Sequence, residues 1–489
     1  MSDGQIQKGI IKRFTIVYMG IVFFSVAIIG RVVYLQFFER EKWNKAQETT
    51  LKEMTIAPGR GDICATDGRV LACSIPYYEI RWDSRCESVS NEYFYKSVDS
   101  LALGLSHLFG DYPKSEYRRQ LVSARNRGER YYLLKRHVSY EQLKKMKTFP
   151  IFRMGQYKGG FIYVRENKRV QPFGSLAART IGYTTESGTI VGIEGSFNKE
   201  LKGEMGIRMM QKIAGGIWMP VNDGGEIEPE DGLDVVTTLD INIQDVAHAA
   251  LQKQLIRHNC SHGSAILMEV NTGEVKAIVN LARAGEGNYV EKYNFALGES
   301  TEPGSTFKLA SLMAALEDGY IELDDTIDTG HGKAKINNWE VRDSKEEGYG
   351  RISVQNVFEV SSNVGVCKLI YNHYKGKERR FIDRIYSMGL NEKMGLQVLG
   401  ETPPYIKYPG DPLWSGVSLI QMAYGYEMQL TPLQILTFYN AVANNGKMVK
   451  PKFVRALSEH GKIVKTYGTE VINSSRSEER RVGKECRSR

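Results

Sequence analysis

The chain has 489 residues, of which 42% are hydrophobic and 25% charged, and its formal net charge is +8 at pH 7. This length and mixed composition exclude a peptide, a fibre or a disordered tail and predict two or three folded domains. The basic excess is spread along the chain, which argues against a dedicated nucleic-acid surface. The six cysteines form no C-x-x-C pair and no Cys/His cluster with zinc spacing, so we predict neither a structural metal nor a disulfide framework.

The first predicted element is an apolar helix near the amino terminus. Seventeen uncharged residues separate Arg13 from Arg31, and apolar residues continue beyond that arginine. A helix over residues 14–38 would extend about 38 Å, enough to cross a hydrocarbon core of about 30 Å. A cleaved signal peptide is the alternative, but the stretch is long and lacks a small-x-small cleavage site. We predict an uncleaved anchor with residues 1–13 in the cytoplasm and the remainder exported. Basic residues lie on both sides of the span, so counting charges does not settle its orientation.

Residues 39–231 show short strand patterns broken by glycines and charged turns, for example at 80–82 and 161–164. These patterns indicate an extended, mixed α/β region. We find no catalytic constellation in it. Ser196 and Lys199 fit the pattern S-x-x-K, and we interpret them as a solvated loop or cap without a catalytic role.

Residues 232–475 contain longer units. A strand is predicted at 235–238 and a helix at about 243–258, followed by a hairpin-like pair of apolar strands at 264–270 and 275–279. A helix followed by such a hairpin indicates a sheet that is covered by helices. The fold class is therefore predicted to be α+β, with an extended first domain and a second domain of helices packed on an antiparallel sheet.

The chemistry is predicted in this second domain, at Ser305 and Lys308. The segment from Glu302 opens a helix whose apolar residues recur at i, i+3, i+4 and i+7 and which ends near Gly319. Being three residues apart, Ser305 and Lys308 face the same way at the helix start. A neutral lysine one turn away can take the serine proton if burial lowers its pKa. The positive end of the helix would also favour an oxyanion, but S-x-x-K alone is more often structural than catalytic.

A second candidate element is the run Ser361-Ser362-Asn363, fifty-six residues after Ser305. A loop at this run would bring a further hydroxyl and an amide toward Lys308. The alternative is an ordinary N-cap serine, since Ser and Asn are preferred at helix starts. The occurrence of both elements in this order favours the catalytic interpretation.

With these two elements the sequence resembles the penicillin-recognising serine acyltransferases, and more closely the class B penicillin-binding proteins. That family carries S-x-x-K, S-x-N and K-T/S-G in this order, and this sequence matches the first two at Ser305/Lys308 and Ser361/Asn363. The resemblance reaches from the anchor to about Val464. It includes three segments that carry no chemistry, namely Arg60-Gly61-Asp62-Ile63, Gly192-Ile193-Glu194 and Thr431-Pro432-Leu433-Gln434. The last of these is also a capping box by its residue types.

The resemblance implies a D,D-transpeptidase that cross-links peptidoglycan stem peptides ending in D-Ala-D-Ala, drawn from lipid-linked precursor strands, and that β-lactams acylate. It implies that Ser305 is the nucleophile and Lys308 its base. Ser361 and Asn363 would position Lys308, relay protons and hold the substrate amide. No metal or organic cofactor is required, and residues 39–231 would form the family's pedestal, or dimerisation, domain.

The resemblance also implies a single-pass protein of the cytoplasmic (inner) membrane with a periplasmic catalytic domain. Glycosyltransferase and divisome proteins are the expected partners, and we favour septal synthesis over elongation. A D,D-carboxypeptidase or a β-lactamase would use the same serine but pass the acyl group to water, and the anchor and pedestal disfavour both. A β-lactamase would also need a carboxylate-activated water, and we interpret Glu401 as a loop residue. A non-catalytic sensor or scaffold would normally carry more membrane spans and a signalling domain.

The third family motif does not occur in this sequence. The segment nearest to K-T/S-G is Lys465-Thr466-Tyr467-Gly468, but its tyrosine and its closeness to Pro451 argue against it. We therefore expect the transpeptidase domain of this chain to be incomplete, and the chain to be inactive by itself. Residues 476–489 read RSEERRVGKECRSR, which looks like the translation of a sequencing adapter; a genuine basic tail is the alternative.

Overall fold

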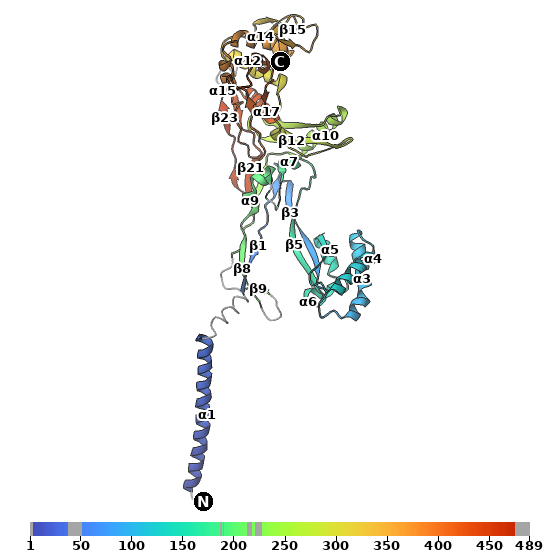
Figure 1. Ribbon diagram of the computed structural model, residues 1–489, viewed down its shortest axis with the longest axis vertical. Coiled ribbons are helices and arrows are strands. Elements are labelled where there is room, and N and C mark those ends of the chain that lie inside the picture. Colours follow the sequence, from blue (N-terminus) through green and yellow to red (C-terminus); the bar gives the residue numbers. More distant parts are fainter. Residues whose placement is uncertain are drawn as a thin grey trace. The chain divides into compact units, whose positions relative to one another are not determined.

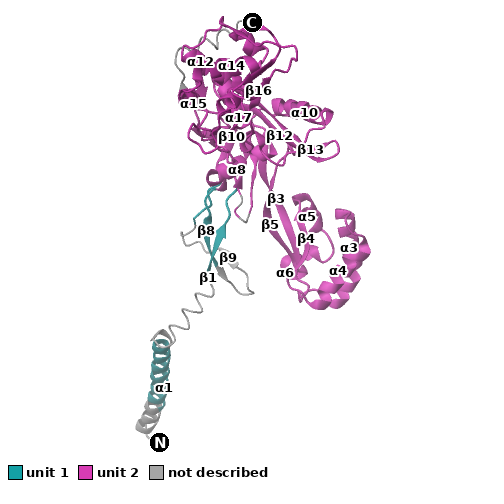
Figure 2. Ribbon diagram, turned by 45° about the horizontal axis from the view of Figure 1, so that its top comes forward, with its two compact units in different colours: residues 1–59, 203–231 teal, residues 60–202, 232–489 magenta. Residues whose placement is uncertain are grey.

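The computed structural model describes residues 3–37, 51–185, 188, 190–212, 218–220 and 227–474 (Figure 1). The proposed adapter segment 476–489 and the last residue of the predicted anchor, Phe38, lie outside these residues. The chain forms two compact units, residues 1–59 with 203–231 and residues 60–202 with 232–489 (Figure 2). The chain passes from the first unit to the second after Asp231. The second domain predicted from the sequence starts at the next residue.

The first unit contains the apolar helix α1, Asp3–Phe37. Its segment Arg13–Tyr34 has a mean hydropathy of 2.3, and every side chain in it is exposed. The hydroxyl of Ser25 is satisfied within the helix, because it donates to the carbonyl of Ile21 at 2.9 Å. By length and composition this helix can cross a membrane, as the sequence predicted.

The same unit contains a small antiparallel sheet of order β1-β8-β9. Strand β1, Leu51–Ile56, pairs along its whole length with β8, Gly206–Lys212. Strand β9, Trp218–Pro220, pairs with the other edge of β8. Two segments distant in sequence are thus joined into one ribbon.

The second unit is organised around a seven-stranded sheet, in the order β22-β21-β10-β2-β3-β4, with β5 also paired to β3. Strand β10 lies between an early and a late segment, because it pairs parallel with β2 and antiparallel with β21. This sheet therefore ties residues 60–202 to residues 232–474. Its strands are β2 Ile63–Cys64, β3 Val70–Trp82, β4 Tyr132–Val138, β5 Phe161–Val170, β10 Asp234–Thr237, β21 Val454–Glu459 and β22 Lys462–Thr466.

Two of the motifs without chemistry meet beside this sheet. The carboxylate of Glu194, whose side chain is 1% exposed, receives hydrogen bonds from the guanidinium groups of Arg60 and Arg169. Gly61 lies so close to the chain that a Cβ atom there would be 2.1 Å from the carbonyl oxygen of Leu233. The arginine, glycine and glutamate of the motifs therefore serve a structural junction with a fully paired buried charge.

Two helices, α3, Asn91–Phe109, and α4, Lys114–Arg127, lie beside the C-terminal end of β3. The sequence analysis placed no helices there. Ser90 caps α3 by accepting the Tyr93 N–H, and Gly110 ends it in the left-handed conformation with φ 67°. The ring of Phe94 stacks on Trp82 at 5.6 Å, and both are fully buried. The helices therefore cover one face of the strand.

The predicted strand, helix and hairpin after residue 232 are confirmed. Helix α10, Ile241–Arg257, is followed by the antiparallel strands β11, His262–Met268, and β12, Val275–Gly285. Strand β13, Asn288–Val290, completes a three-stranded sheet. The buried side chain of Gln244 on α10 exchanges two hydrogen bonds with the backbone of Ile278, at 2.8 and 2.9 Å, which fixes the helix on β12.

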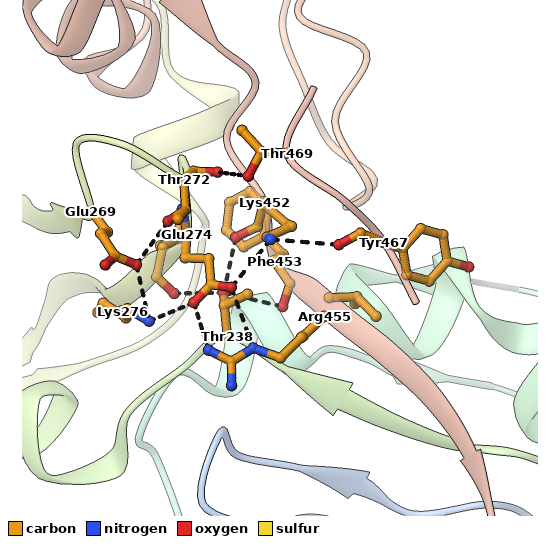
Figure 3. A network of polar contacts seen from close by, with 12 residues as sticks. Thr238, Glu269, Thr272, Glu274, Lys276, Lys452, Phe453, Arg455, Tyr467 and Thr469 are labelled. Atoms are coloured by element: carbon orange, nitrogen blue, oxygen red, sulfur yellow. Dashed lines mark hydrogen bonds and ion pairs between the residues drawn. The ribbon is translucent and has the colours of Figure 1, made fainter. Parts of the chain in front are cut away.

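A network of charges joins the turn before β12 to β21 (Figure 3). Glu274, 6% exposed, forms ion pairs with Lys276, Lys452 and Arg455. Although burial opposes ionisation, the hydrogen bonds from these three cations lower the pKa of Glu274 to about 2. The three cations therefore hold a buried carboxylate permanently ionised.

The remaining core is helical, and α12, Lys308–Glu317, lies within it with Lys308 to Ala315 all buried. Thr431 and Gln434 form the predicted capping box of α17, Pro432–Ala443, with Pro432 at its first position. The other helices are η1 Phe152–Met154, α5 Tyr140–Met146, α6 Gly155–Gly159, α7 Ala178–Ile181, α8 Gly192–Ser196, α9 Asn198–Lys202, α11 Phe295–Gly298, α13 Val354–Glu359, α14 Asn363–Tyr374, α15 Glu378–Ser387 and α16 Ser418–Ala423. The other strands are β6 Tyr183–Thr184, β7 Ile190–Val191, β14 Thr326–Asp328, β15 Lys333–Ile336, β16 Trp339–Arg342, β17 Arg351–Ser353, β18 Tyr405–Ile406, β19 Met428–Gln429, β20 Lys447–Val449 and β23 Val471–Ser474.

Candidate active site

Ser305 lies in a 3-10 turn, η2 Gly304–Phe307, and the α-helix proper begins at Lys308. The predicted helix is therefore present, but its first turn is tighter than an α-helix. Ser305 is exposed, and its hydroxyl has no hydrogen-bond partner among the residues that the structure describes. The hydroxyl is thus available to an incoming molecule.

A second loop fixes the backbone just before Ser305. Gly304, with φ 55°, donates its N–H to the carbonyl of Gly425 at 2.9 Å. A Cβ atom on Gly425 would lie 2.0 Å from the carbonyl oxygen of Gly304, so only glycine fits at 425. The carboxylate of Glu302 accepts the N–H of Glu427 at 3.0 Å. These contacts hold the turn that presents Ser305.

Lys308 is 1% exposed, in contrast to Ser305. Its ammonium donates to Ser361, to the carbonyl oxygen at 2.6 Å and to Oγ at 2.9 Å. Burial is the main cause that lowers the pKa of Lys308, to about 8, and the charge of Asp343 acts in the opposite direction. A lysine in this state gives up its proton far more readily than an exposed one and can act as a base.

The Ser361-Ser362-Asn363 run forms the turn that enters α14. Ser361 has a positive φ of 53°, which directs its carbonyl and hydroxyl to Lys308. Ser362 is the N-cap of α14 and accepts the N–H of Gly365 at 2.9 Å. Asn363 donates its side-chain amide to the carbonyl of Arg342 at 2.7 Å. The N-cap interpretation therefore applies to Ser362, whereas Ser361, the serine of the predicted catalytic pair, contacts Lys308.

The structure thus joins Lys308 and Ser361 directly, and it places Asn363 at the end of the same turn, where α14 begins. It shows no hydrogen bond between Ser305 and Lys308 within the described ranges. Catalytic hydrogen bonds are often long or poorly aligned until substrate binds. The roles of the four residues therefore stay predictions, supported by the contact between Lys308 and Ser361.

Sequence reasoning missed Asp343 and Gly425. Asp343 accepts hydrogen bonds from the hydroxyl of Ser362 at 2.9 Å and from the N–H of Val364 at 2.9 Å. It stands in a run of charged residues and matches no motif, so its position in the sequence carries no signal. Gly425 is one glycine among 48, and its importance depends on a contact with residue 304.

Other candidate positions have structural partners. The hydroxyl of Ser196 donates to the carbonyl of Gly192 and accepts the N–H of Leu399, each at 3.0 Å. Glu401 accepts three backbone N–H groups, from residues 394 to 396, and so closes a loop. Lys465 lies on β22, which pairs with β21 in the large sheet. In the part of the chain that the structure describes, no group of three or more His, Cys, Asp or Glu side chains could hold a metal ion.

Comparison with known proteins gives two family matches. Residues 263–481 match the penicillin binding protein transpeptidase domain, and residues 55–237 match the penicillin-binding protein dimerisation domain. PenA of Neisseria meningitidis serogroup A, named a probable peptidoglycan D,D-transpeptidase, is 27% identical over 467 residues, covering 92% of this chain and 75% of PenA. The peptidoglycan D,D-transpeptidase FtsI of Escherichia coli K12 is 26% identical over 431 residues, covering 86% of this chain and 68% of FtsI.

The fold is similar to two solved structures. The crystal structure of penicillin binding protein 2X from Streptococcus thermophilus superposes with a TM-score of 0.69 at 23% identity, covering 89% of this chain and 65% of that chain. A peptidoglycan synthetase from Bifidobacterium adolescentis gives a TM-score of 0.60 at 19% identity, covering 87% and 79%. At these identities the structures establish a common fold.

Proposed function

The chain belongs to the class B penicillin-binding proteins, peptidoglycan D,D-transpeptidases with a dimerisation and a transpeptidase domain, and we propose that its acyl transfer runs through Ser305 as nucleophile and Lys308 as base. The observation that carries this assignment is the burial of Lys308 without a carboxylate partner in hydrogen-bond contact. Its pKa of about 8 leaves a useful fraction of neutral amine near neutral pH.

In the acylation step, Ser305 Oγ attacks the carbonyl carbon of the penultimate D-alanine of a stem peptide. The Oγ proton passes to Lys308 Nζ, and the C–O bond forms. When the C–N bond breaks, the departing amine of the terminal D-alanine receives a proton from Lys308, directly or through the Ser361 hydroxyl, which lies 2.9 Å from Nζ. The product is an ester on Ser305 and free D-alanine.

In the transfer step, an amine of a neighbouring stem peptide attacks the ester carbonyl. Lys308 takes a proton from this amine, the ester C–O bond breaks, and Ser305 Oγ recovers a proton. Asn363 contributes by its amide to the binding of the acyl chain, next to the turn that holds Ser361. A β-lactam also forms an ester at Ser305 when its lactam C–N bond breaks, but the departing nitrogen stays tethered to the acyl group and occupies the site of the incoming amine.

We further propose a single-pass topology in which α1 anchors the chain in the cytoplasmic membrane and both domains lie in the periplasm. The exposed apolar helix supports the anchor. The relatives that include FtsI support the septal assignment made from the sequence. Glycosyltransferase and divisome proteins are the corresponding partners.

The test is covalent labelling of the purified full chain. The sequence contains no Lys-Thr-Gly or Lys-Ser-Gly, the motif that the family resemblance associates with the substrate carboxylate, so the first probe is a small sulfonyl fluoride without a carboxylate. Intact mass and peptide mapping should place one adduct on Ser305 and none in Ser305→Ala, whereas Ser300→Ala should label normally. A fluorescent penicillin should label the same hydroxyl only inefficiently, because we expect this chain to be inactive by itself. Labelling of Ser305→Ala at the wild-type rate would refute the assignment.

A further inference from the structure

Asp343 is a buried carboxylate without an ion-pair partner. Its side chain belongs to a residue that is 8% exposed, directly after β16. It accepts hydrogen bonds from Ser362 and Val364, and in the described part of the chain no cation lies within ion-pair distance of it. Buried carboxylates are costly unless a positive charge compensates them. The position of Asp343 therefore calls for a compensating charge nearby.

Lys308 is the complementary case, a buried ammonium whose two hydrogen-bond acceptors are neutral. The turn of residues 361–363 separates the two charges. Ser361 contacts Lys308 on one side, and Ser362 contacts Asp343 on the other. The charge of Asp343 acts on Lys308 through this turn. Each buried charge is thus the counter-charge of the other.

Resting on the proposed function, we propose that Asp343 is a positioning residue for acyl transfer. It holds the Ser361–Asn363 turn against Lys308, and it stabilises the ammonium that forms when Lys308 takes the proton of Ser305. The carboxylate does not touch the substrate. Its effect on the reaction passes through Lys308 and Ser361.

The titratable groups around Lys308 support a specific electrostatic role. Cys367 on α14 and Asp343 after β16 are the two that act on it in the described residues. Burial raises the pKa of the Cys367 thiol far above its ordinary value, so that thiol is neutral wherever Lys308 titrates. The neighbouring Arg342 is exposed and pairs with Glu340. The negative charge next to Lys308 therefore comes from Asp343.

A helix cap is the competing role. Asp343 accepts the N–H of Val364 in the first turn of α14, where a negative charge stabilises a helix. A cap alone would contribute to stability and would leave the ionisation of Lys308 unchanged. The counter-charge role predicts that removal of the carboxylate makes the ammonium less favourable, so the pKa of Lys308 falls. Titration of Lys308 therefore separates the two roles.

The experiment is an NMR titration of the full chain with ¹³Cε-labelled lysine, in which Lys308→Arg identifies the Lys308 signal. In Asp343→Asn the pKa of Lys308 should fall by about one unit relative to wild type. Asp343→Glu, which keeps the charge, should restore most of the difference. Glu340→Gln removes a charge from the same strand at an exposed position and should leave the value unchanged.

If Asp343→Asn fails to fold, Asp343→Ser removes the same charge and leaves a hydroxyl to accept the Val364 N–H, and the same decrease is expected. An unchanged Lys308 pKa in the folded neutral variant would overturn the inference, as would an equal decrease in Asp343→Glu. Because the readout is the ionisation of Lys308, it is independent of labelling at Ser305. Failure of the inference and failure of the proposed function are therefore distinguishable.

Discussion

The second unit contains two buried ionisable side chains, one with charged partners and one with neutral hydrogen-bond partners. Glu274, in the junction between the turn before β12 and β21, contacts three cations, and its pKa is lowered to about 2 (Figure 3). Lys308 contacts a hydroxyl and a carbonyl, and its pKa is lowered to about 8. Both side chains are below a tenth exposed. Their partners therefore account for the difference.

The difference separates a structural charge from a reactive one. The pairing of Glu274 favours its ionised form, so its charge is fixed over the whole physiological range and contributes to stability. Burial of Lys308 disfavours its charged form, so the folded protein keeps a group that is ready to exchange a proton. A lysine at 308 that was paired with a carboxylate would contribute more to stability, but a smaller fraction of it would be neutral and able to accept a proton near neutral pH.

The largest expected effect is on reactivity. Lys308→Met removes the base, so sulfonylation of Ser305 at pH 8 should slow by about 10³-fold. Lys335→Met, at an exposed position of β15, should react at the wild-type rate. The rates are measured by intact mass against time. An equal loss in both variants would mean that the effect is not specific to Lys308.

Glu274→Gln should destabilise the protein by about 3 kcal/mol, because three cations lose their counter-charge, although two of them still reach solvent. Its free energy of unfolding is measured by urea titration. Glu269→Gln, whose partly exposed carboxylate lies 3.5 Å from Lys276, should cost well under 1 kcal/mol. Similar losses in the two variants would contradict the structural role of Glu274.

Lys308→Met should differ from the wild type in the pH dependence of its free energy of unfolding, because it removes the titrating ammonium. The pKa of Lys308 is about 8 when folded and 10.5 for an ordinary lysine. The unfolded chain therefore binds more protons between these values, and the wild type should gain stability as pH rises through them. A free energy of unfolding that rises equally in Lys308→Met and in the wild type between pH 8 and pH 10.5 would contradict this linkage.

The smallest effect is an acid dependence that comes from Glu274. Its pKa falls from 4.5 to about 2 on folding, so its contribution is complete above pH 4.5 and is lost as pH falls toward 2. Between pH 6 and 4 the wild type should lose about 1 kcal/mol that Glu274→Gln does not lose. Parallel pH profiles for the two proteins would rule out this linkage.

The sequence identified what depends on short spacing. Ser305 and Lys308 are three residues apart, and the capping box of Thr431 and Gln434 spans four residues, so both are visible without the fold. Helix α3 also has a local signature, with Ser90 and Gly110 as its caps, but it lies between strand patterns, which predict an extended region. The pairs Asp343–Ser362 and Gly304–Gly425 depend on contacts between distant segments, for which the sequence has no local signature.

The most direct test of the central claim is the pH dependence of Ser305 sulfonylation in the wild-type chain. If Lys308 is the base, the rate should rise with pH and level off with a midpoint near 8, the pKa of its amine. A rate that is flat from pH 6 to 9, or that rises only above pH 10 as for an ordinary lysine, would contradict the account.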